Sequence, residues 1–284
     1  MDKSKKIYVI TGAASGIGLA LTKRLCGDNI IFAGYRSEEK RGILESITDG
    51  IYPKGIYPQK IYPFYADYSK PETIAEAAEY IKSNTDRVDT LINVAGCVVA
   101  GPVENIHMNE IRRQFDVNVF GHIEMAQRLA ELLANGRIIN VSSMASFGIF
   151  PFISPYCASK RCLDMFFNSF LIENKRNIKV ISIKPGVIVT PLWEKSVSEN
   201  SKYKDICDGY EKEMDYVMKN AQKNESSGLN VEKVVDVIVK ADAARNPKLS
   251  YTVGSDAFVA KMISKLPQSV VNGIVKAGIK LRIK

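Results

Sequence analysis

Short apolar runs alternate along the chain with longer segments in which apolar residues recur every three or four positions. The short runs predict buried strands, and the longer segments predict amphipathic helices. Strands are expected at Lys6–Ile10, Asn29–Gly34, Lys60–Tyr65, Asp89–Asn93, Gly136–Val141, Ile178–Ile183 and Leu249–Val253. Because helices separate the strands, the pattern predicts an α/β fold, a Rossmann-like doubly wound parallel sheet of about seven strands with helices on both faces.

Helical periodicity predicts helices at Glu38–Ile47, Pro71–Asn84, Asn109–Ala134, Asn230–Ala243 and Pro267–Gly278, and a further helix that contains Tyr156. Ser69 is expected to cap the helix that begins at Pro71. Asn118 falls inside a helix, where asparagine is locally unfavourable, so it either satisfies a buried polar group or is exposed. Residues 192–227 mix charges with aromatic residues and methionine, which is typical of lid helices over a cleft or of a surface helical insertion.

The tripeptide Ile-Tyr-Pro occurs three times at a five-residue period between Ile51 and Pro63. The units are too few for a solenoid, and the prolines prevent a helix. We expect an exposed loop that leads into the third strand, and the repeat indicates no function.

Composition sets broad limits on the protein. The chain has 284 residues, of which 46% are hydrophobic and 25% charged, as in ordinary globular proteins. Its five cysteines are scattered and form no CxxC pair, so the sequence suggests neither a disulfide framework nor a zinc site, and a reducing, cytoplasmic setting fits best. The N-terminal apolar run is too short for a signal peptide. Net charge is +8, but residues 261–284 alone carry six basic residues and no acidic one, which argues against a nucleic-acid-binding face.

A glycine-rich turn lies between the first strand and the next helical segment. It contains Gly12, Gly16 and Gly18. In dinucleotide-binding proteins such glycines let the backbone turn tightly and approach a pyrophosphate, which the free N–H groups at the helix start then bind. The spacing is GxxxGxG and not the more familiar GxGxxG, and a plain strand–helix connection is the alternative interpretation.

The residue that follows the second strand indicates which dinucleotide is bound. NAD sites place an acidic residue near this point for the ribose 2′-hydroxyl, whereas an arginine accommodates the 2′-phosphate of NADP. The sequence here is Tyr35-Arg36 and therefore favours NADP over NAD. The alternative is a surface arginine at the start of a helix.

Tyr156 and Lys160 are four residues apart in a helical pattern, so their side chains rise from the same helix face. An ammonium group beside a phenol favours the phenolate, and the pKa of Tyr156 is therefore expected to fall toward the working range of a general acid or base. Taken alone, such a pair is more often an exposed tyrosine with a solvated lysine, so the rest of the chain has to decide between the two interpretations.

The order of these motifs resembles the short-chain dehydrogenase/reductase family from Lys6 to about Val253. The matching residues are Thr11–Gly18 as TGxxxGIG, Asp67 after the third strand, Asn93–Gly96, Asn118, Ser143 thirteen positions before Tyr156, Lys160, and Pro185-Gly186 with Thr190. Val94 stands where the family usually has a second asparagine, which puts a sheet-stabilising side chain in doubt. The finer details FGHIEMAQ, PFISPYCASK and TVGSDA resemble the branch that includes hydroxysteroid and retinol dehydrogenases.

The resemblance implies hydride transfer between a nicotinamide cofactor and a carbonyl or alcohol. Tyr156 would exchange the proton with the substrate oxygen, Lys160 would lower the pKa of Tyr156 and bind the nicotinamide ribose, and Ser143 would hydrogen-bond the substrate oxygen. Asn118 would hold a water that links Lys160 to solvent. Cofactor contacts are implied at Gly12, Ser15, Gly16, Ile17, Gly18, Arg36, Asp67, Asn93, Ala95, Gly96, Tyr156, Lys160, Pro185, Gly186, Ile188 and Thr190, and no metal is implied.

We therefore expect an NADP-dependent oxidoreductase for an apolar carbonyl or alcohol, such as a hydroxysteroid, a retinoid or a similar ketone. Met144, Phe150 and Trp193 are expected to line the substrate site together with Ser143 and Tyr156. The alternative is a catalytically silent NADP-binding sensor or scaffold protein. The intact set of catalytic residues argues against that alternative, because a sensor needs only the cofactor residues.

Residues 1–255 are expected to form a single dinucleotide-binding and catalytic domain, with residues 192–227 as a substrate lid and residues 256–284 as a basic helical tail. A tail helix packed on the domain or on another subunit is favoured over one that lies on an anionic membrane surface. We expect a homo-oligomer, either a dimer or a tetramer.

Overall fold

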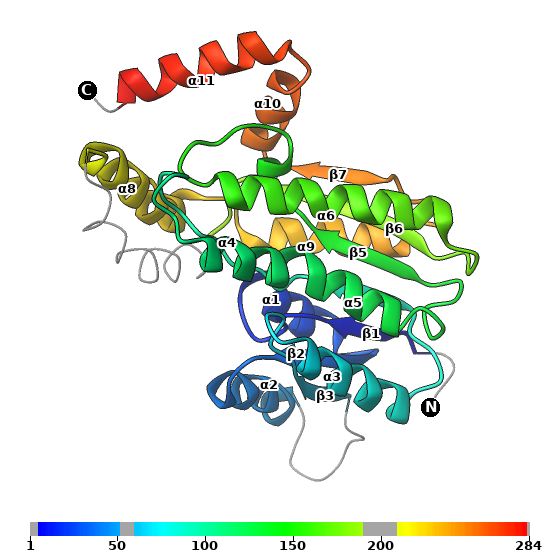
Figure 1. Ribbon diagram of the computed structural model, residues 1–284. Helices are drawn as coiled ribbons and strands as arrows, with labels where there is room; N and C mark the ends of the chain where they lie inside the picture. The colour runs from blue at the N-terminus through cyan, green and yellow to red at the C-terminus, as the bar shows by residue number, and fades with distance from the viewer. Residues whose placement is uncertain (1–4, 52–59, 190–208, 283–284) are drawn as a thin grey trace.

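The computed structural model describes residues 5–51, 60–189 and 209–282, and a parallel sheet lies at its centre (Figure 1). Within these residues seven strands pair in the order β3-β2-β1-β4-β5-β6-β7, and every pairing is parallel. The strands are β1 (Ile7–Ile10), β2 (Ile30–Tyr35), β3 (Ile61–Tyr65), β4 (Thr90–Asn93), β5 (Arg137–Val141), β6 (Lys179–Pro185) and β7 (Ser250–Val253). The predicted fold class is confirmed, and each predicted strand is present to within two residues at its ends.

Helices pack on both faces of the sheet. One face is covered by α1 (Gly16–Leu25), α2 (Glu38–Ile51) and α9 (Val231–Ala243), and the other by α3 (Pro71–Asn84), α5 (Gly121–Arg128) and α6 (Ser154–Glu173). The remaining elements are α4 (Met108–Phe115), the π-helix η1 (Asp116–Phe120), the 3-10 turn η2 (Met144–Ser146), α8 (Glu211–Ser227), α10 (Ser255–Ile263) and α11 (Gln268–Arg282).

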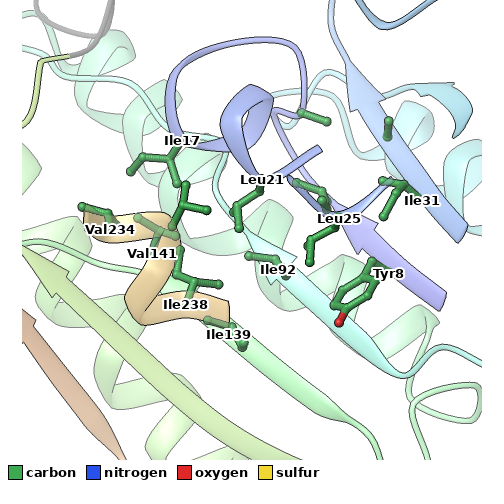
Figure 2. Close-up of a cluster of buried hydrophobic side chains, with 14 of the residues drawn as sticks. Tyr8, Ile17, Leu21, Leu25, Ile31, Ile92, Ile139, Val141, Val234 and Ile238 are labelled. Carbon is green, nitrogen blue, oxygen red and sulfur yellow. The ribbon is translucent and has the colours of Figure 1, made fainter. Parts of the chain in front are cut away.

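Successive residues of the central strands supply the two halves of the core. In β1, Ile7 and Val9 pack against the α3/α5/α6 side, whereas Tyr8 and Ile10 pack against the α1/α2/α9 side. Because both faces of a parallel sheet are covered by helices, its strands are apolar at nearly every position, which is the pattern seen in the sequence. Figure 2 shows the half of the core on the α1/α2/α9 side, where Leu21 of α1 lies near the strand side chains.

The order of the strands places a ligand site at the carboxyl ends of the strands, which we call the ligand edge. Strand order reverses between β1 and β4, and in doubly wound sheets ligands bind beyond the carboxyl ends of the strands at this reversal. The glycine-rich turn follows β1 and the Asn93–Gly96 segment follows β4, so these two predicted cofactor segments meet there.

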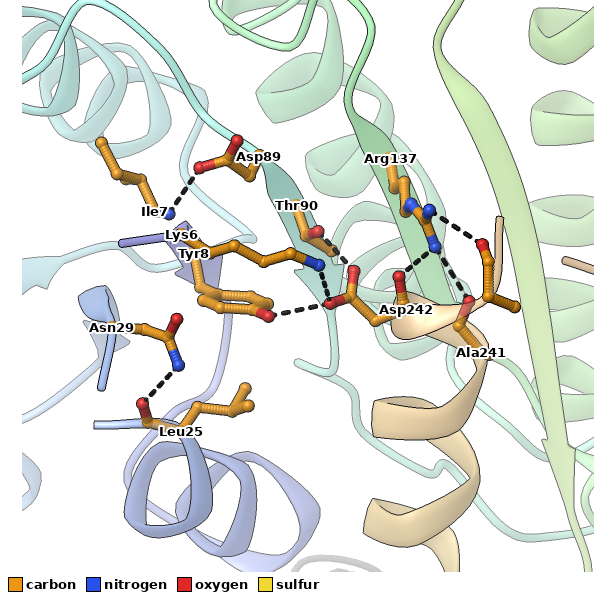
Figure 3. A network of polar contacts seen from close by, with 11 residues as sticks. Lys6, Ile7, Tyr8, Leu25, Asn29, Asp89, Thr90, Arg137, Ala241 and Asp242 are labelled. Atoms are coloured by element: carbon orange, nitrogen blue, oxygen red, sulfur yellow. Dashed lines mark hydrogen bonds and ion pairs between the residues drawn. The ribbon is translucent and has the colours of Figure 1, made fainter. Parts of the chain in front are cut away.

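A polar network closes the opposite, amino-terminal end of the sheet (Figure 3). The carboxylate of Asp242, at the end of α9, accepts hydrogen bonds from the Tyr8 hydroxyl at 2.8 Å and from the Thr90 hydroxyl at 2.6 Å. Lys6 Nζ pairs with the same carboxylate at 2.8 Å, and Arg137 donates to main-chain carbonyls at the end of α9. The network joins β1, β4, β5 and α9 away from the ligand edge.

The predicted helix Asn109–Ala134 is helical without a break from Met108 to Arg128, and it ends earlier than expected. Its middle turn is the π-helix η1, with α4 before it and α5 after it. A π-helical turn widens the helix locally and is frequent at functional sites. The periodicity of the sequence predicts the helix but does not distinguish a π turn within it.

Two further details near the predicted helices are corrected. The N-cap of α3 is Lys70, without a side-chain capping bond, and Ser69 instead hydrogen-bonds the carboxylate of Asp67. The predicted cap is therefore wrong. Within the tail expected to be helical, the periodicity of the sequence bounds one helix only, Pro267–Gly278, and the structure has α10 before it.

Two predicted segments fall partly outside the described residues, namely the central part of the Ile-Tyr-Pro loop and the first part of the proposed lid, residues 192–208. The described part of the lid segment is anchored near its start. The Tyr210 hydroxyl donates to Glu104 at 2.7 Å, and its ring lies 6.3 Å from the ring of Phe152.

Candidate active site

The turn after β1 fits a pyrophosphate. Gly12 has φ of +62°, and a Cβ there would lie 3.1 Å from Ala95 Cα, while a Cβ at Gly18 would lie 2.2 Å from the Gly12 carbonyl oxygen. Ser15 is the N-cap of α1, yet its side chain makes no capping bond, so the first N–H groups of α1 can bind a ligand. The turn therefore has the cradle that a dinucleotide needs. It also contains the predicted contacts Gly16 and Ile17.

The loop after β4 is held against this turn by Thr11, the first residue of the matched motif, and by His122, which the sequence analysis did not single out. Thr11 Oγ1 accepts hydrogen bonds from the N–H groups of Val94 and Ala95, at 2.8 and 3.0 Å. His122 Nε2 lies 2.8 Å from the Ala95 carbonyl oxygen. Burial, aided by the charge of Lys160, lowers the pKa of His122 to about 3, so its ring is neutral and acts as a donor to the loop.

Asn93 and Gly96, both predicted cofactor contacts, have different environments. The amide of Asn93 is buried and donates to Asn140 Oδ1 at 2.8 Å, so only the main chain of Asn93 can reach a ligand beyond the strand end. A Cβ at Gly96 would lie 3.3 Å from Asn118 Oδ1 and 3.7 Å from Lys160 Nζ. Gly96 therefore lies directly against two of the predicted catalytic residues.

Arg36 and Asp67 follow the adjacent strands β2 and β3 and so share the ligand edge. Arg36 is exposed, and Asp67 is partly buried. Burial acts to raise the pKa of Asp67, but hydrogen bonds from Ser69 at 2.7 and 3.0 Å outweigh it, and the charges of Arg36 and Lys70 act with them. The net result is a lowered pKa and an ionised carboxylate.

The catalytic residues expected on α6 and after β5 come together. Tyr156 and Lys160 rise from the first turns of α6 and are 7% and 4% exposed. Ser143 is the N-cap of η2, where it accepts from the Ala145 N–H at 3.1 Å, and its hydroxyl hydrogen-bonds Tyr156. Lys160 Nζ donates to the Val141 carbonyl at 2.9 Å and lies 5.9 Å from the centre of the Tyr156 ring.

The pKa values of this pair depart from the expectation. Burial raises the pKa of Tyr156 to about 12, although the hydrogen bond to Ser143 acts in the opposite direction. Burial also lowers the pKa of Lys160 to about 8, although the charge of Asp164 acts to raise it. The predicted fall in the Tyr156 pKa is therefore wrong for this structure, because the cost of burying a phenolate exceeds the favourable interactions around it.

Asn118 satisfies a buried polar group, which is one of the two alternatives that its position in the sequence allows. Its Oδ1 accepts from the Cys97 N–H at 2.9 Å, and its Nδ2 donates to the Cys97 carbonyl and to Ser159 Oγ, both at 3.0 Å. Ser159 lies between Tyr156 and Lys160 and donates to the Tyr156 carbonyl at 2.8 Å. Asn118 thus joins the loop after β4 to the catalytic turn of α6.

A buried ion pair, which the sequence analysis missed, lies one helical turn beyond Lys160. Asp164 is 6% exposed; it accepts from Ser182 Oγ at 2.7 Å, and its other oxygen lies 2.7 Å from Lys184 Nζ. The same Lys184 Nζ lies 4.6 Å from the centre of the Phe147 ring, just after η2. The spacing of four residues from Lys160 was the available signal.

The segment after β6 is constrained by α10. A Cβ at Gly186 would lie 2.0 Å from an oxygen of Asp256, whose other oxygen accepts from the Val187 N–H at 2.8 Å. Gly186 is therefore needed for this close packing as well as for any cofactor contact. Pro185 and Ile188 are buried, and Ile188 forms an isolated parallel bridge to the segment before α9.

The side chains next to Tyr156 are apolar. Those that pack with it in one small cluster are Val98, Ala145, Phe150, Ile153 and Cys157. Of the predicted substrate residues, Phe150 belongs to this cluster and Met144 is partly buried in η2, while Trp193 lies outside the described residues, as does the predicted cofactor contact Thr190.

Comparison with known proteins gives the family. Residues 6–201 match the family described as short chain dehydrogenase. The chain is 29% identical to the uncharacterized oxidoreductase YusZ of Bacillus subtilis, over 96% of this chain and 98% of the relative. It is 28% identical to an NADPH-dependent 3-dehydrocapnine reductase of Ornithobacterium rhinotracheale, over 89% of each, and 30% identical to mouse estradiol 17-beta-dehydrogenase 2, over 96% and 75%.

Solved structures agree on the fold. A short-chain dehydrogenase from Streptomyces avermitilis superposes with a TM-score of 0.75 at 22% identity, over 99% of this chain and 98% of that one. A short-chain dehydrogenase from Burkholderia cenocepacia in complex with NADP superposes with a TM-score of 0.69 at 21% identity, over 95% and 97%.

The chain therefore belongs to the short-chain dehydrogenase/reductase family. It is an oxidoreductase that binds a nicotinamide cofactor and acts on the carbonyl or alcohol group of a small molecule. Over the residues that the structure describes, no helix combines the length and the apolar character needed to span a bilayer.

Proposed function

We propose that the protein is an NADP-dependent oxidoreductase for an apolar ketone or alcohol, with Ser143, Tyr156, Lys160 and Asn118 as its catalytic residues. The observation that carries the proposal is the environment of Tyr156. Its hydroxyl bonds Ser143, while its ring packs in the apolar cluster that contains Phe150. A substrate with few polar groups beyond its reacting oxygen suits such walls.

The reaction assigned to these residues is proton transfer coupled to hydride transfer. The bound cofactor supplies or accepts the hydride at the substrate carbon. In the reductive direction, Tyr156 gives its phenolic proton to the substrate oxygen, and Ser143 holds that oxygen by a hydrogen bond. The ammonium of Lys160 stabilises the phenolate that forms on Tyr156. Both Nδ2 hydrogens of Asn118 already donate hydrogen bonds within the protein. The water proposed there would therefore donate to Asn118 Oδ1 or to the main-chain carbonyl of Asn118.

The pKa values give the protonation states of Tyr156 and Lys160 at neutral pH. A tyrosine whose pKa is about 12 keeps its proton at pH 7 and can act as an acid. A lysine whose pKa is about 8 is mostly charged at that pH. This combination equips Tyr156 to act as the acid when a ketone is reduced at neutral pH, whereas oxidation of an alcohol needs the phenolate and becomes faster as the pH rises.

The preference for NADP over NAD is part of the proposal. Arg36 is exposed directly after β2, at the ligand edge, where a cation binds the 2′-phosphate. The relative from Ornithobacterium is NADPH-dependent by its name, which supports the same preference. Asp67 lies beside Arg36 and is ionised, so its carboxylate would accept hydrogen bonds from the cofactor at the ligand edge.

The experiment that tests the proposal is a screen of NADPH oxidation with steroids, retinoids and long-chain ketones, followed by Tyr156→Phe. Because the variant loses only the proton donor, we expect kcat to fall by about 10²–10⁴ while NADPH binding stays within twofold. Tyr80→Phe, at an exposed tyrosine of α3, is the matched control and should retain full activity. A Tyr156→Phe enzyme within tenfold of wild type would refute the assignment, and full NADPH binding without turnover of any carbonyl would favour the silent sensor.

A further inference from the structure

The last two helices expose a set of large apolar side chains that the rest of the described chain does not cover. They are between 43% and 78% exposed, and we call them the C-terminal apolar surface: Phe258, Val259, Met262, Leu266, Val270, Ile274 and Leu281. Single exposed apolar residues are common on soluble proteins, but a run of this length on two consecutive helices requires an explanation. Figure 1 shows α10 rising from the end of β7 and α11 lying beyond it at the margin of the molecule.

On α11 the exposed residues form a regular stripe. Val270, Ile274 and Leu281 are separated by four and seven positions and so lie on one side of the helix. Val271 is buried and Val275 is partly buried, and they define a second apolar side that faces the protein. Of the two placements expected from the sequence, on the domain or on another subunit, packing on the domain therefore accounts for only one of the two apolar sides.

The charges around the surface indicate what covers it. From Ala257 to Lys284 the chain carries six basic residues and no acidic one, so this segment supplies six of the eight net positive charges. Lys276 and Lys280 are exposed on α11 beside the stripe, and Lys265 is exposed in the turn between α10 and α11. A second copy of the chain would bring like charges together, whereas an anionic bilayer accepts both the apolar side chains and the lysines.

The surface adjoins the candidate active site. Asp256, at the start of α10, accepts a hydrogen bond from Val187 in the segment after β6. The helix α10 also packs against η2, the turn that follows Ser143. A ligand that approaches along α10 therefore arrives beside the catalytic residues.

We propose that the C-terminal apolar surface docks the protein reversibly on anionic lipid bilayers, with the apolar stripe of α11 in the interface and the lysines at the headgroups. An apolar substrate partitions into the bilayer, so docking would bring the candidate active site close to it. In this respect the inference rests on the proposed function. Docking itself requires no turnover.

Co-sedimentation of the full-length protein with phosphatidylcholine vesicles, with and without phosphatidylserine, tests the docking. We expect binding only to vesicles that contain phosphatidylserine, with release at high salt. Lys276→Gln/Lys280→Gln should weaken binding at least tenfold, because each basic residue at an anionic surface contributes roughly fivefold. Ile274→Ser/Leu281→Ser should weaken it as well. The matched control, Lys82→Gln/Ile172→Ser, removes an exposed lysine of α3 and an exposed apolar residue of α6 and should bind as the wild type does.

Any of three results would overturn the proposal. The first is that the wild type fails to sediment with anionic vesicles at low salt, and the second is that the control pair weakens binding as much as the α11 pairs. The third is that Ile274→Ser/Leu281→Ser converts a dimer into a monomer on size-exclusion chromatography. The last result would show that a second copy covers the surface. A NADPH oxidation assay on a soluble ketone, run without vesicles, keeps the two hypotheses apart: vesicle binding without any turnover leaves the docking intact and refutes the proposed reaction.

Discussion

Substitution of Asp164 tests how the candidate active site sets the pKa of Lys160. It lies one turn beyond Lys160 on α6, buried, and its charge favours the ammonium form of Lys160 against the effect of burial. We predict that Asp164→Asn lowers the pKa of Lys160. The decline of the reductive kcat/KM at high pH, where Lys160 loses its proton, then begins at lower pH than in the wild type, for which the midpoint is expected at about 8.

The size of the effect follows from the geometry. Charges on adjacent helical turns are about 6 Å apart and interact by roughly 3 kcal/mol at an effective dielectric constant of about 20. The ammonium of Lys184, 2.7 Å from the Asp164 carboxylate, is present in both enzymes and therefore leaves this difference unchanged. Since one pH unit corresponds to about 1.4 kcal/mol, the midpoint of the pH profile should move down by roughly two pH units.

The other titratable groups around Lys160 do not reproduce this change. His122 on α5 is neutral, because its pKa is about 3. Tyr156 keeps its proton until about pH 12. Cys97, on the loop after β4, acts in the same direction as Asp164 and is present in both enzymes. The shift between wild type and variant is therefore attributable to Asp164.

The assay is the pH profile of NADPH oxidation between about pH 5 and 10, with kcat and KM measured separately. Asp164→Glu should restore the wild-type midpoint, and Asp236→Asn, at an exposed position of α9, should leave the profile unchanged. If Asp164→Asn lowers kcat by the same factor at every pH, the residue only supports the packing of α6, and the electrostatic reasoning is refuted.

Two other substitutions test the cofactor site and the scaffold. Arg36→Asp should lower the ratio of kcat/KM for NADPH to that for NADH by roughly tenfold to a hundredfold, because a charge-assisted phosphate contact is lost; an unchanged ratio, equal to that of the charge-matched control Lys82→Asp, would place Arg36 away from the phosphate. Asp242→Ala should reduce the free energy of unfolding by roughly 3–5 kcal/mol, since it leaves two buried hydroxyl donors unpaired, while the half-exposed Lys6 adds little. Urea unfolding measures this loss, and a value below about 1 kcal/mol would contradict the role of the network.

Local pattern was sufficient for the sheet and for the placement of Tyr156 and Lys160 on one helix. The apolar runs specify strands because a strand buried on both faces excludes charge, and the glycine turn specifies the βα connection because only glycine fits the left-handed backbone of Gly12. The spacing of Tyr156 and Lys160 places both on one side of a helix wherever that helix lies. These features depend on a few neighbouring residues, and the sequence therefore determined them.

The environment of each site residue depended on elements far away in the chain. Whether Asn118 is buried or exposed follows from the packing of η1 against Cys97 and α6, and the rise in the pKa of Tyr156 follows from how deeply α6 is covered. The pairing of Asp164 with Lys184 requires β6 to lie under α6. Burial and charge pairing are sums over neighbours that no local spacing encodes, so only the tertiary structure decided them.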